Sequence, residues 1–271
     1  MRNMAIIKNA AATIRRRPLN RTMKKIRFSL FLATAASLFL PLGAQATIVD
    51  LTTTTSSGTI NGVQFQFADH PSGTGLVQAF LRVQANGTEQ GYNTSGTPVP
   101  FDDKAGTFTH DLTIANLMPT EVTVGGVNYF RLLLGIDQLS ASPNISLDQL
   151  QIYVGTTGSL TTTNLSSLGT LVYTFSPGDA VYLNAKRSTG NGTGDMFALI
   201  PVSLFNSFPT SDFVYLYSHF GNTFATNGGF EEWSLFSPIP EASAFFPIFG
   251  LLAAIFSTQF VRRRQLQRVS K

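Results

Sequence analysis

The sequence predicts an all-β protein: an antiparallel β-sandwich, of which a jelly roll is one arrangement, with one apolar helix before it and one after it. Three observations lead to this prediction. Short runs of alternating polar and apolar residues recur between residues 47 and 236, separated by turn-forming residues. No long run with the 3.6-residue helical period lies between them. One apolar run lies near each end of the 271-residue chain.

The expected strands are defined by alternation and by turns. The strand candidates are 63–67, 108–114, 147–154, 168–175, 196–201 and 213–217. Asn61-Gly62 and Asn86-Gly87 have the composition of tight hairpin turns, and Gly125-Gly126 separates 121–124 from 127–134 in the same way. Residues rich in Gly, Pro, Ser and Asp predict loops at 69–74, 91–106 and 188–195.

Charge divides the chain into three parts. Residues 1–46 hold 9 of the 19 Lys and Arg residues, and 242–271 hold 5 more, with no acid in either segment. Residues 47–241 keep 5 basic residues against all 15 acidic ones, so their net charge is 5 − 15 = −10. A surface of that sign repels a phosphate backbone, so we expect no nucleic-acid partner.

The chain contains no cysteine. Disulfides, thiolate metal sites and a cysteine nucleophile are therefore excluded. An exported domain of this composition must be held together by its apolar core, and its length is sufficient to bury one.

The N-terminal segment predicts an export signal over residues 1–46. A basic stretch after Met23 precedes an apolar run over 28–42, and the run leads to Ala44-Gln45-Ala46. A basic region, an apolar region and a small-x-small site are the three parts of a secretory signal peptide. We expect a signal helix that signal peptidase cleaves after Ala46, and Met23 as the true start.

The C-terminal segment predicts a membrane span. Residues 242–261 are uncharged and long enough for one helical crossing, and Arg262, Arg263 and Arg264 follow directly. Arginine clusters stay on the cytoplasmic side, so the β domain is expected beyond the inner membrane. Pro238 and Pro240 keep the preceding segment extended.

The tail over 237–271 resembles the PEP-CTERM sorting signal, which combines a Pro-Glu-Pro-like motif, one membrane helix and an arginine-rich end. Here the motif reads Pro240-Glu241-Ala242, so its third position departs from the usual proline. The resemblance implies an exosortase-type partner, a membrane-embedded enzyme similar to cysteine transpeptidases. It also implies cleavage near the motif, release or attachment at the cell surface, and bacteria that make exopolysaccharide and biofilm. The alternative is a simple membrane anchor without processing.

Candidate catalytic residues are few, and we expect no enzyme. His70, His110 and His219 are far apart, and no Gly-x-Ser-x-Gly motif accompanies them. Two adjacent acid pairs, Asp102-Asp103 and Glu231-Glu232, could serve a glycosidase, but catalytic carboxyls usually come from separate elements.

Acidic residues in loops suggest a calcium ion as a ligand, and aromatic residues suggest a sugar. Calcium prefers carboxylate and carbonyl oxygens, so Asp102, Asp103, Asp179 and Asp195 are its candidate ligands, although no Asp-x-Asp-x-Asp-Gly pattern is present. Tyr92, Tyr215 and Tyr217 could stack on sugars if they are exposed. Trp233, next to the tail, is expected to pack against the last strand of the domain.

Three functions follow from these observations. The first is a structural or adhesive role in an extracellular polysaccharide matrix. The alternatives are a carbohydrate-binding module, which exposed aromatic residues on one sheet face would favour, and a jelly-roll glycan hydrolase, which two converging carboxyls in a pocket would favour.

Overall fold

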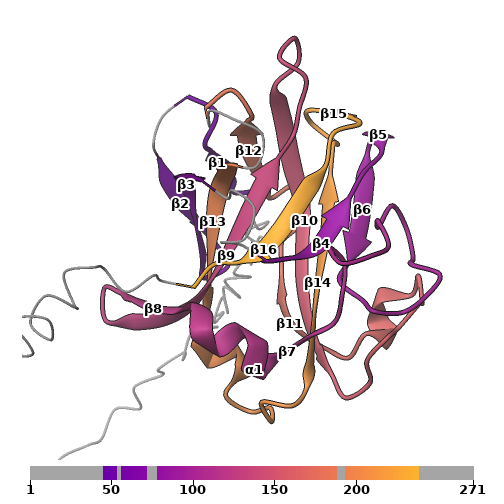
Figure 1. Cartoon of the computed structure of the whole chain (residues 1–271). Helices are drawn as coiled ribbons and strands as arrows, with labels where there is room; N and C mark the ends of the chain where they lie inside the picture. The colour runs from indigo at the N-terminus through magenta and orange to yellow at the C-terminus, as the bar shows by residue number, and fades with distance from the viewer. Residues whose placement is uncertain (1–44, 54–55, 72–77, 188–192, 238–271) are drawn as a thin grey trace, which may run out of the picture. The chain divides into compact units, whose positions relative to one another are not determined.

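A computed structural model describes residues 45–53, 56–71, 78–187 and 193–237 (Figure 1). The predicted signal helix, Ala44, the span over 242–261, Pro240-Glu241-Ala242 and Arg262–Arg264 lie outside these residues. Ala46 lies inside them and is exposed. Within the described part of the chain, no helix has the length and apolar character that a membrane crossing requires.

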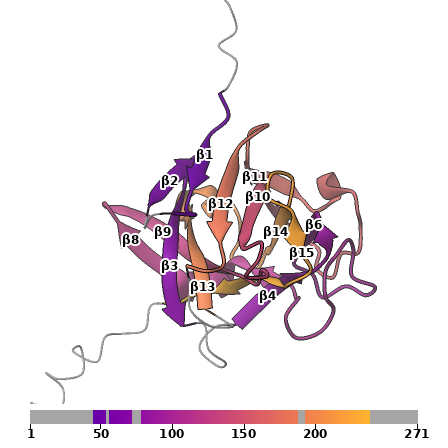
Figure 2. The same cartoon turned by 90° about the horizontal axis from the view of Figure 1, so that it is seen from above.

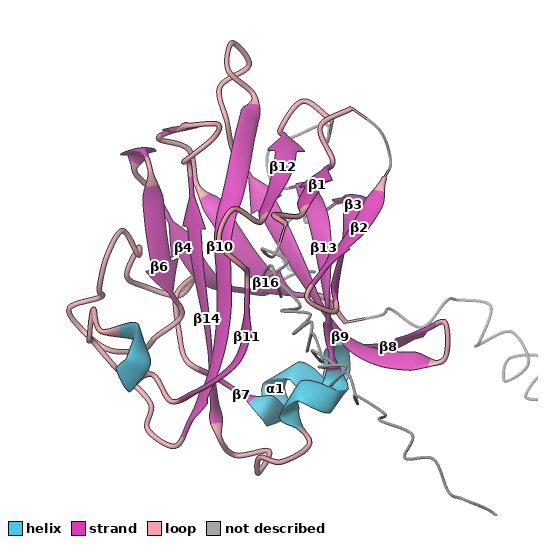
Figure 3. Ribbon diagram, turned by 180° about the vertical axis from the view of Figure 1, so that it is seen from behind, coloured by secondary structure: helices cyan, strands magenta, loops and turns pink. Residues whose placement is uncertain are grey.

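The described strands form two seven-stranded sheets and one two-stranded sheet. Sheet 1 has the order β1 (Ile48–Asp50), β12 (Ala180–Asn184), β10 (Asn144–Gly155), β14 (Phe213–Phe220) and β6 (Glu89–Tyr92). In addition, β11 (Thr170–Thr174) pairs with β10, and β7 (Leu112–Thr113) pairs with β14. Figure 3 shows β10, β11 and β14 side by side.

Sheet 2 has the order β2 (Ser57–Ile60), β3 (Val63–Pro71), β13 (Thr193–Pro201), β9 (Val127–Ile136), β16 (Glu231–Leu235) and β4 (Gln78–Val83), and β8 (Glu121–Val124) pairs with β9. The small sheet pairs β5 (Asn86–Gly87) with β15 (Thr226–Asn227). Among the described pairs, β1 and β12 are parallel and the others are antiparallel (Figure 2). The all-β prediction with antiparallel sheets is therefore confirmed.

One apolar core lies between the two sheets, because alternate residues of each strand point inward. Val214, Leu216 and Phe220 of β14 belong to it together with Met196 and Ala198 of β13. The largest fully buried side chain is Trp233, whose Nε1 donates to Ser218 Oγ at 3.2 Å. Trp233 therefore lies on the last described strand and fills the core between the sheets, which corrects the expectation that it packs against that strand from beside the tail.

The predicted hairpins are partly confirmed. Asn61-Gly62 joins β2 to β3 with φ angles of 48° and 90°, values that glycine and asparagine adopt more readily than other residues. Gly125-Gly126 joins β8 to β9. Asn86-Gly87 does not close a hairpin between β4 and β6, because those strands belong to different sheets and the pair instead forms β5.

The predicted strand over 108–114 is wrong for most of its length. Strand β7 contains Leu112 and Thr113, and helix α1 (Ile114–Leu117) follows at once (Figure 3). The side-chain oxygen Oδ1 of Asn116 accepts hydrogen bonds from the Thr113 backbone nitrogen and hydroxyl, at 2.7 and 2.8 Å, and this local contact starts the helix. Three short 3₁₀ turns occupy Met118–Thr120, Leu165–Ser167 and Val202–Phe205.

Candidate functional site

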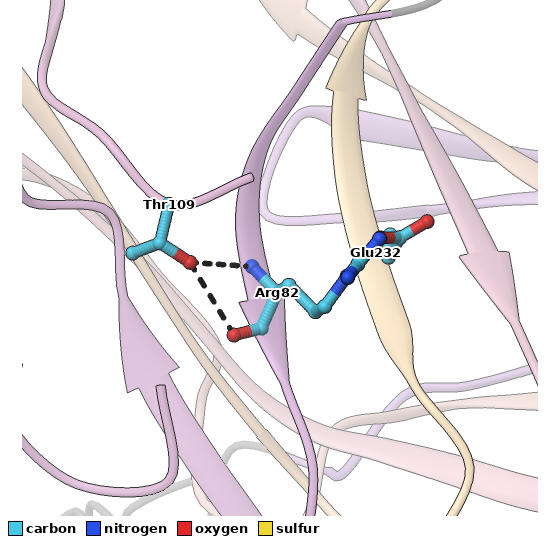
Figure 4. A network of polar contacts seen from close by, with 3 residues as sticks. All are labelled: Arg82, Thr109 and Glu232. Atoms are coloured by element: carbon cyan, nitrogen blue, oxygen red, sulfur yellow. Dashed lines mark hydrogen bonds and ion pairs between the residues drawn. The ribbon is translucent and has the colours of Figure 1, made fainter. Parts of the chain in front are cut away.

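The outer face of sheet 2 carries an ion pair at its β4 edge (Figure 4). Val83 is fully buried in the core, so its neighbour Arg82 points outward by strand alternation. Glu232 lies directly opposite Arg82 on β16, and Arg82 Nε donates to its carboxylate. The pair is partly exposed, with side-chain exposures of 20% for Arg82 and 31% for Glu232.

Two exposed phenyl rings flank this arginine. The guanidinium carbon of Arg82 lies 3.5 Å from the ring centroid of Phe108 and 4.8 Å from that of Phe230. Both distances are in the range of cation–π contacts. Phe108 is 44% exposed and Phe230 is 38% exposed. We call Phe108, Arg82, Phe230 and Glu232 the aromatic platform.

Hydrogen bonds hold the loop that carries Phe108 against β4. Thr109 Oγ1 accepts from the Arg82 backbone nitrogen at 3.1 Å and contacts its carbonyl at 3.5 Å (Figure 4). On either side, Lys104 N donates to Arg82 O at 2.9 Å, and His110 N donates to Phe80 O at 3.0 Å. The platform is therefore assembled before any ligand arrives, which reduces the entropy cost of binding.

Sequence reasoning did not identify the platform. Arg82, Phe108 and Phe230 come from three separate segments, and no motif links them. Alternation along β4 and β16 is the signal that could have placed Arg82 and Glu232 outward, but the register between the two strands was needed to pair them.

A second feature is a buried carboxyl pair between the sheets. Glu89 of β6 is 1% exposed and Glu231 of β16 is fully buried. Ala85 N donates to Glu89 Oε2 at 2.7 Å, and Gln138 Nε2 donates to Glu231 Oε1 at 2.5 Å. Apart from the partner carboxyl of the pair, no protein donor reaches Glu89 Oε1 or Glu231 Oε2 in the described part of the chain.

These two carboxyls hydrogen-bond to each other, which requires that one of them carries a proton. Burial raises the pKa of Glu89. Burial, the hydrogen bond to Glu89 and the charge of Glu89 raise the pKa of Glu231 well above its ordinary value. The predicted acid pair Glu231-Glu232 is thus divided between the two faces of β16, and Glu231 converges with Glu89 instead. Because a glycosidase needs both carboxyls beside its substrate, this sealed pair gives no support to a hydrolase.

The other predicted acid pair is also divided. Asp103 is 6% exposed, and burial raises its pKa to about 8. It faces Gly91, where an added Cβ would lie 1.6 Å from its Oδ1, so the carboxyl occupies space that any other residue at position 91 would fill. Asp102 is half-buried and accepts a hydrogen bond from Gln90 N at 3.0 Å.

The four candidate calcium ligands do not form one site. Asp179 accepts from the backbone nitrogens of Thr47 and Ser176, both at 2.7 Å, and Asp195 accepts from Ile136 N at 2.8 Å. Among the described residues, no group of three His, Cys, Asp or Glu side chains could hold a metal ion. Asp102 and Asp103 stay adjacent, while Asp179 lies before β12 and Asp195 lies on β13.

The tyrosines predicted to stack on sugars are buried. Tyr92 and Tyr215 are fully buried and Tyr217 is 3% exposed, in a second apolar cluster on the outer face of sheet 1. Tyr92 Oη donates to the carbonyls of Leu160 and Thr162 at 3.1 and 2.9 Å, so the covering loop is hydrogen-bonded to this cluster. A sugar cannot reach their rings.

A polar groove of about 440 Å³ also opens on the outer face of sheet 1. Gln149 and Gln151 of β10 line it, together with Asn222 and residues 175–180. Asp148 Oδ2 accepts from Asn222 N at 2.7 Å and thereby holds one wall in place. Gln149 and Asn222 are exposed and available to a ligand, but no exposed aromatic ring lines the groove.

No protein-family model, no curated protein and no solved structure matches this chain.

Proposed function

We propose that the β domain is a non-catalytic glycan-binding module, and that the aromatic platform is the surface that contacts the glycan. The observation that carries the proposal is the position of Arg82, held between two exposed phenyl rings and joined to Glu232. This surface best matches the carbohydrate-binding alternative among the three functions considered.

The chemistry of the platform suits a sugar ring. A pyranose has an apolar C–H face, which can lie on a phenyl ring, and a rim of hydroxyls, which need donors and acceptors. Phe108 and Phe230 supply the apolar contact, and the guanidinium of Arg82 and the carboxylate of Glu232 supply charge-assisted hydrogen bonds. The net charge of −10 over 47–241 favours a neutral glycan over a strongly anionic one.

Removing both rings of the platform should weaken glycan binding. For the double variant Phe108→Ala, Phe230→Ala we expect retention by exopolysaccharide from the producing cells to fall by about tenfold or more, equivalent to about 1.4 kcal/mol. Affinity electrophoresis in gels that contain this polysaccharide measures the change. Leu171→Ala is the matched control, because Leu171 is 46% exposed and lies on β11 of the other sheet.

Two outcomes would contradict this assignment. Equal retention of the double variant and the wild-type protein would remove the platform as the binding surface. Loss of retention in Gln149→Ala, Asn222→Ala, with the platform variant unaffected, would move the site to the groove on sheet 1.

We further propose that the protein is exported across the inner membrane, held there transiently by the span over 242–261, and sorted to the cell surface or the extracellular matrix. Its partners on this route are signal peptidase and an exosortase-type enzyme that reads Pro240-Glu241-Ala242. The basic ends and the acidic middle of the chain support this route. A jelly roll is our proposal for the connectivity, because strands adjacent in each sheet, such as β10 and β14, come from distant parts of the chain.

Intact-mass analysis tests the route. We expect a mature chain that starts at Thr47 and ends near Glu241 in cells with the exosortase. In cells without it, we expect the arginine tail to remain on the membrane-bound chain. Retention of the tail in every fraction of both strains would show a simple membrane anchor instead.

A further inference from the structure

The start of β1 is fixed to the start of β12 by one buried acid. Asp179 is 3% exposed, and its Oδ1 accepts a hydrogen bond from the Thr47 backbone nitrogen at 2.7 Å. Its Oδ2 accepts from Ser176 N at 2.7 Å, and Ala180 N donates to Thr47 O at 3.0 Å. Thr47 is therefore hydrogen-bonded at both its nitrogen and its carbonyl oxygen.

Among the described residues, the donors to Asp179 are the backbone amides of Thr47 and Ser176. Among the described residues, no basic side chain forms an ion pair with it; the ion pair found there joins Arg82 to Glu232. A carboxylate at this depth is expensive to bury unless an opposite charge compensates it. The position of Thr47 N, at hydrogen-bond distance from Oδ1, is where such a charge would be most effective.

We propose that cleavage after Ala46 supplies this charge, so that the new α-ammonium group of Thr47 forms an ion pair with Asp179. Hydrolysis breaks the bond between the Ala46 carbonyl carbon and Thr47 N; water adds a hydroxyl to the carbon and a proton to the nitrogen. The amine then takes up a further proton from solvent. The inference rests on the cleavage point in the proposed export route and adds a structural role for that cleavage.

Two features of the fold fit this role. Gln45 and Ala46 are exposed, so a peptidase can reach the peptide bond between Ala46 and Thr47. Strand β1 has three residues and lies at the edge of sheet 1, where β12 is its one partner among the described strands (Figure 2). An ion pair at the first residue stabilises an edge strand this short more than it would stabilise a central strand, which has hydrogen-bonded neighbours on both sides.

The test compares two forms of the chain that ends at Lys271, both purified in detergent micelles. One form starts at Thr47 and the other retains Gln45-Ala46, which moves the ammonium group away from Asp179. We expect the form that starts at Thr47 to unfold about 4 °C higher. In the Asp179→Asn background, we expect the two forms to unfold at the same temperature.

A further sample makes the test independent of how well Asp179→Asn folds. Acetylation of the Thr47 amine keeps Asp179 and removes the charge, so we expect it to lower the unfolding temperature to that of the longer form. Equal unfolding temperatures for the free and acetylated amines would overturn the proposal, as would a difference that persists in Asp179→Asn. Neither readout involves glycan, and N-terminal sequencing of the exported protein tests the cleavage point separately.

Discussion

The purified protein should lose stability as the pH rises from about 5 to 8, because the Glu89–Glu231 pair holds a proton in the folded state. Both carboxyls are buried between the sheets, and each has one oxygen that, apart from the partner carboxyl, no protein donor among the described residues reaches. Ionisation of both would leave two like charges in contact in a medium of low dielectric constant.

The direction of this effect follows from proton linkage. Below the ordinary glutamate pKa of 4.5, the folded and unfolded chains both hold the proton, and pH has no effect through this pair. Above it, the unfolded chain releases the proton while the folded chain keeps it, because its pKa is raised. The free energy of unfolding therefore falls by up to about 1.4 kcal/mol per pH unit for each proton retained, until the folded pKa is passed.

Glu231→Gln isolates the contribution of the pair. The amide donates a hydrogen bond to Glu89 without a bound proton, so the slope of stability against pH should flatten and the variant should exceed the wild-type protein in stability near pH 8. Urea unfolding at pH 5, 6, 7 and 8 measures this. Glu232→Gln is the control, since it changes the same charge on the outer face of the same strand. A slope unchanged by Glu231→Gln would show that the pair holds no proton.

Asp103 should also contribute to the decrease of the free energy of unfolding with rising pH. Burial raises its pKa to about 8, so it also retains a proton that the unfolded chain releases. Part of the pH dependence should therefore survive in Glu231→Gln.

Replacing Trp233 with alanine should cost about 3–5 kcal/mol of folding free energy, the range measured for the largest core truncations. Trp233 is fully buried, and its indole nitrogen donates to Ser218 Oγ on the opposite sheet. The truncation opens a cavity between the sheets and leaves the Ser218 hydroxyl, which is itself fully buried, without this donor.

Guanidinium unfolding followed by far-ultraviolet circular dichroism measures this loss, because Trp233 is the only tryptophan and its fluorescence disappears with it. Trp233→Phe keeps most of the apolar contact and should cost less. Leu171→Ala, at an exposed position, should cost little. A cost for Trp233→Ala that is as small as the cost for Leu171→Ala would contradict the assignment of Trp233 to the centre of the core.

Local patterns predicted much of the fold. Alternation placed 147–154 and 213–217 in strands, and the structure confirms these as β10 and β14. Val63 to Phe67 is confirmed as part of β3. The prediction failed at 108–114, where alternating residues end in a capped helix, since the hydrogen bonds of Asn116 to Thr113 outweigh a periodicity of two.

The candidate site could not be predicted in the same way. The sequence places Glu231 beside Glu232, but strand alternation sends them to opposite faces, and the partner of each is set by long-range register. Glu89 lies 142 positions before Glu231, and only the packing of the two sheets against each other brings the two carboxyls together. A loop covers three tyrosines of the second apolar cluster, Tyr92, Tyr215 and Tyr217, and so buries them. The alternation of polar and apolar residues along a strand does not predict where such a loop will lie.

The central position of β16 in sheet 2 affects the order in which the domain folds and its resistance to a pulling force. It is the last strand of the described domain, yet it lies between β9 and β4 and pairs with both. The sheet cannot close until Leu235 is available to pair, so under the export route proposed above the domain reaches its final shape only after Leu235 has crossed the membrane. A chain pulled from its tail would then meet resistance from two hydrogen-bonded neighbours at once, which is the shear geometry of a strong anchor.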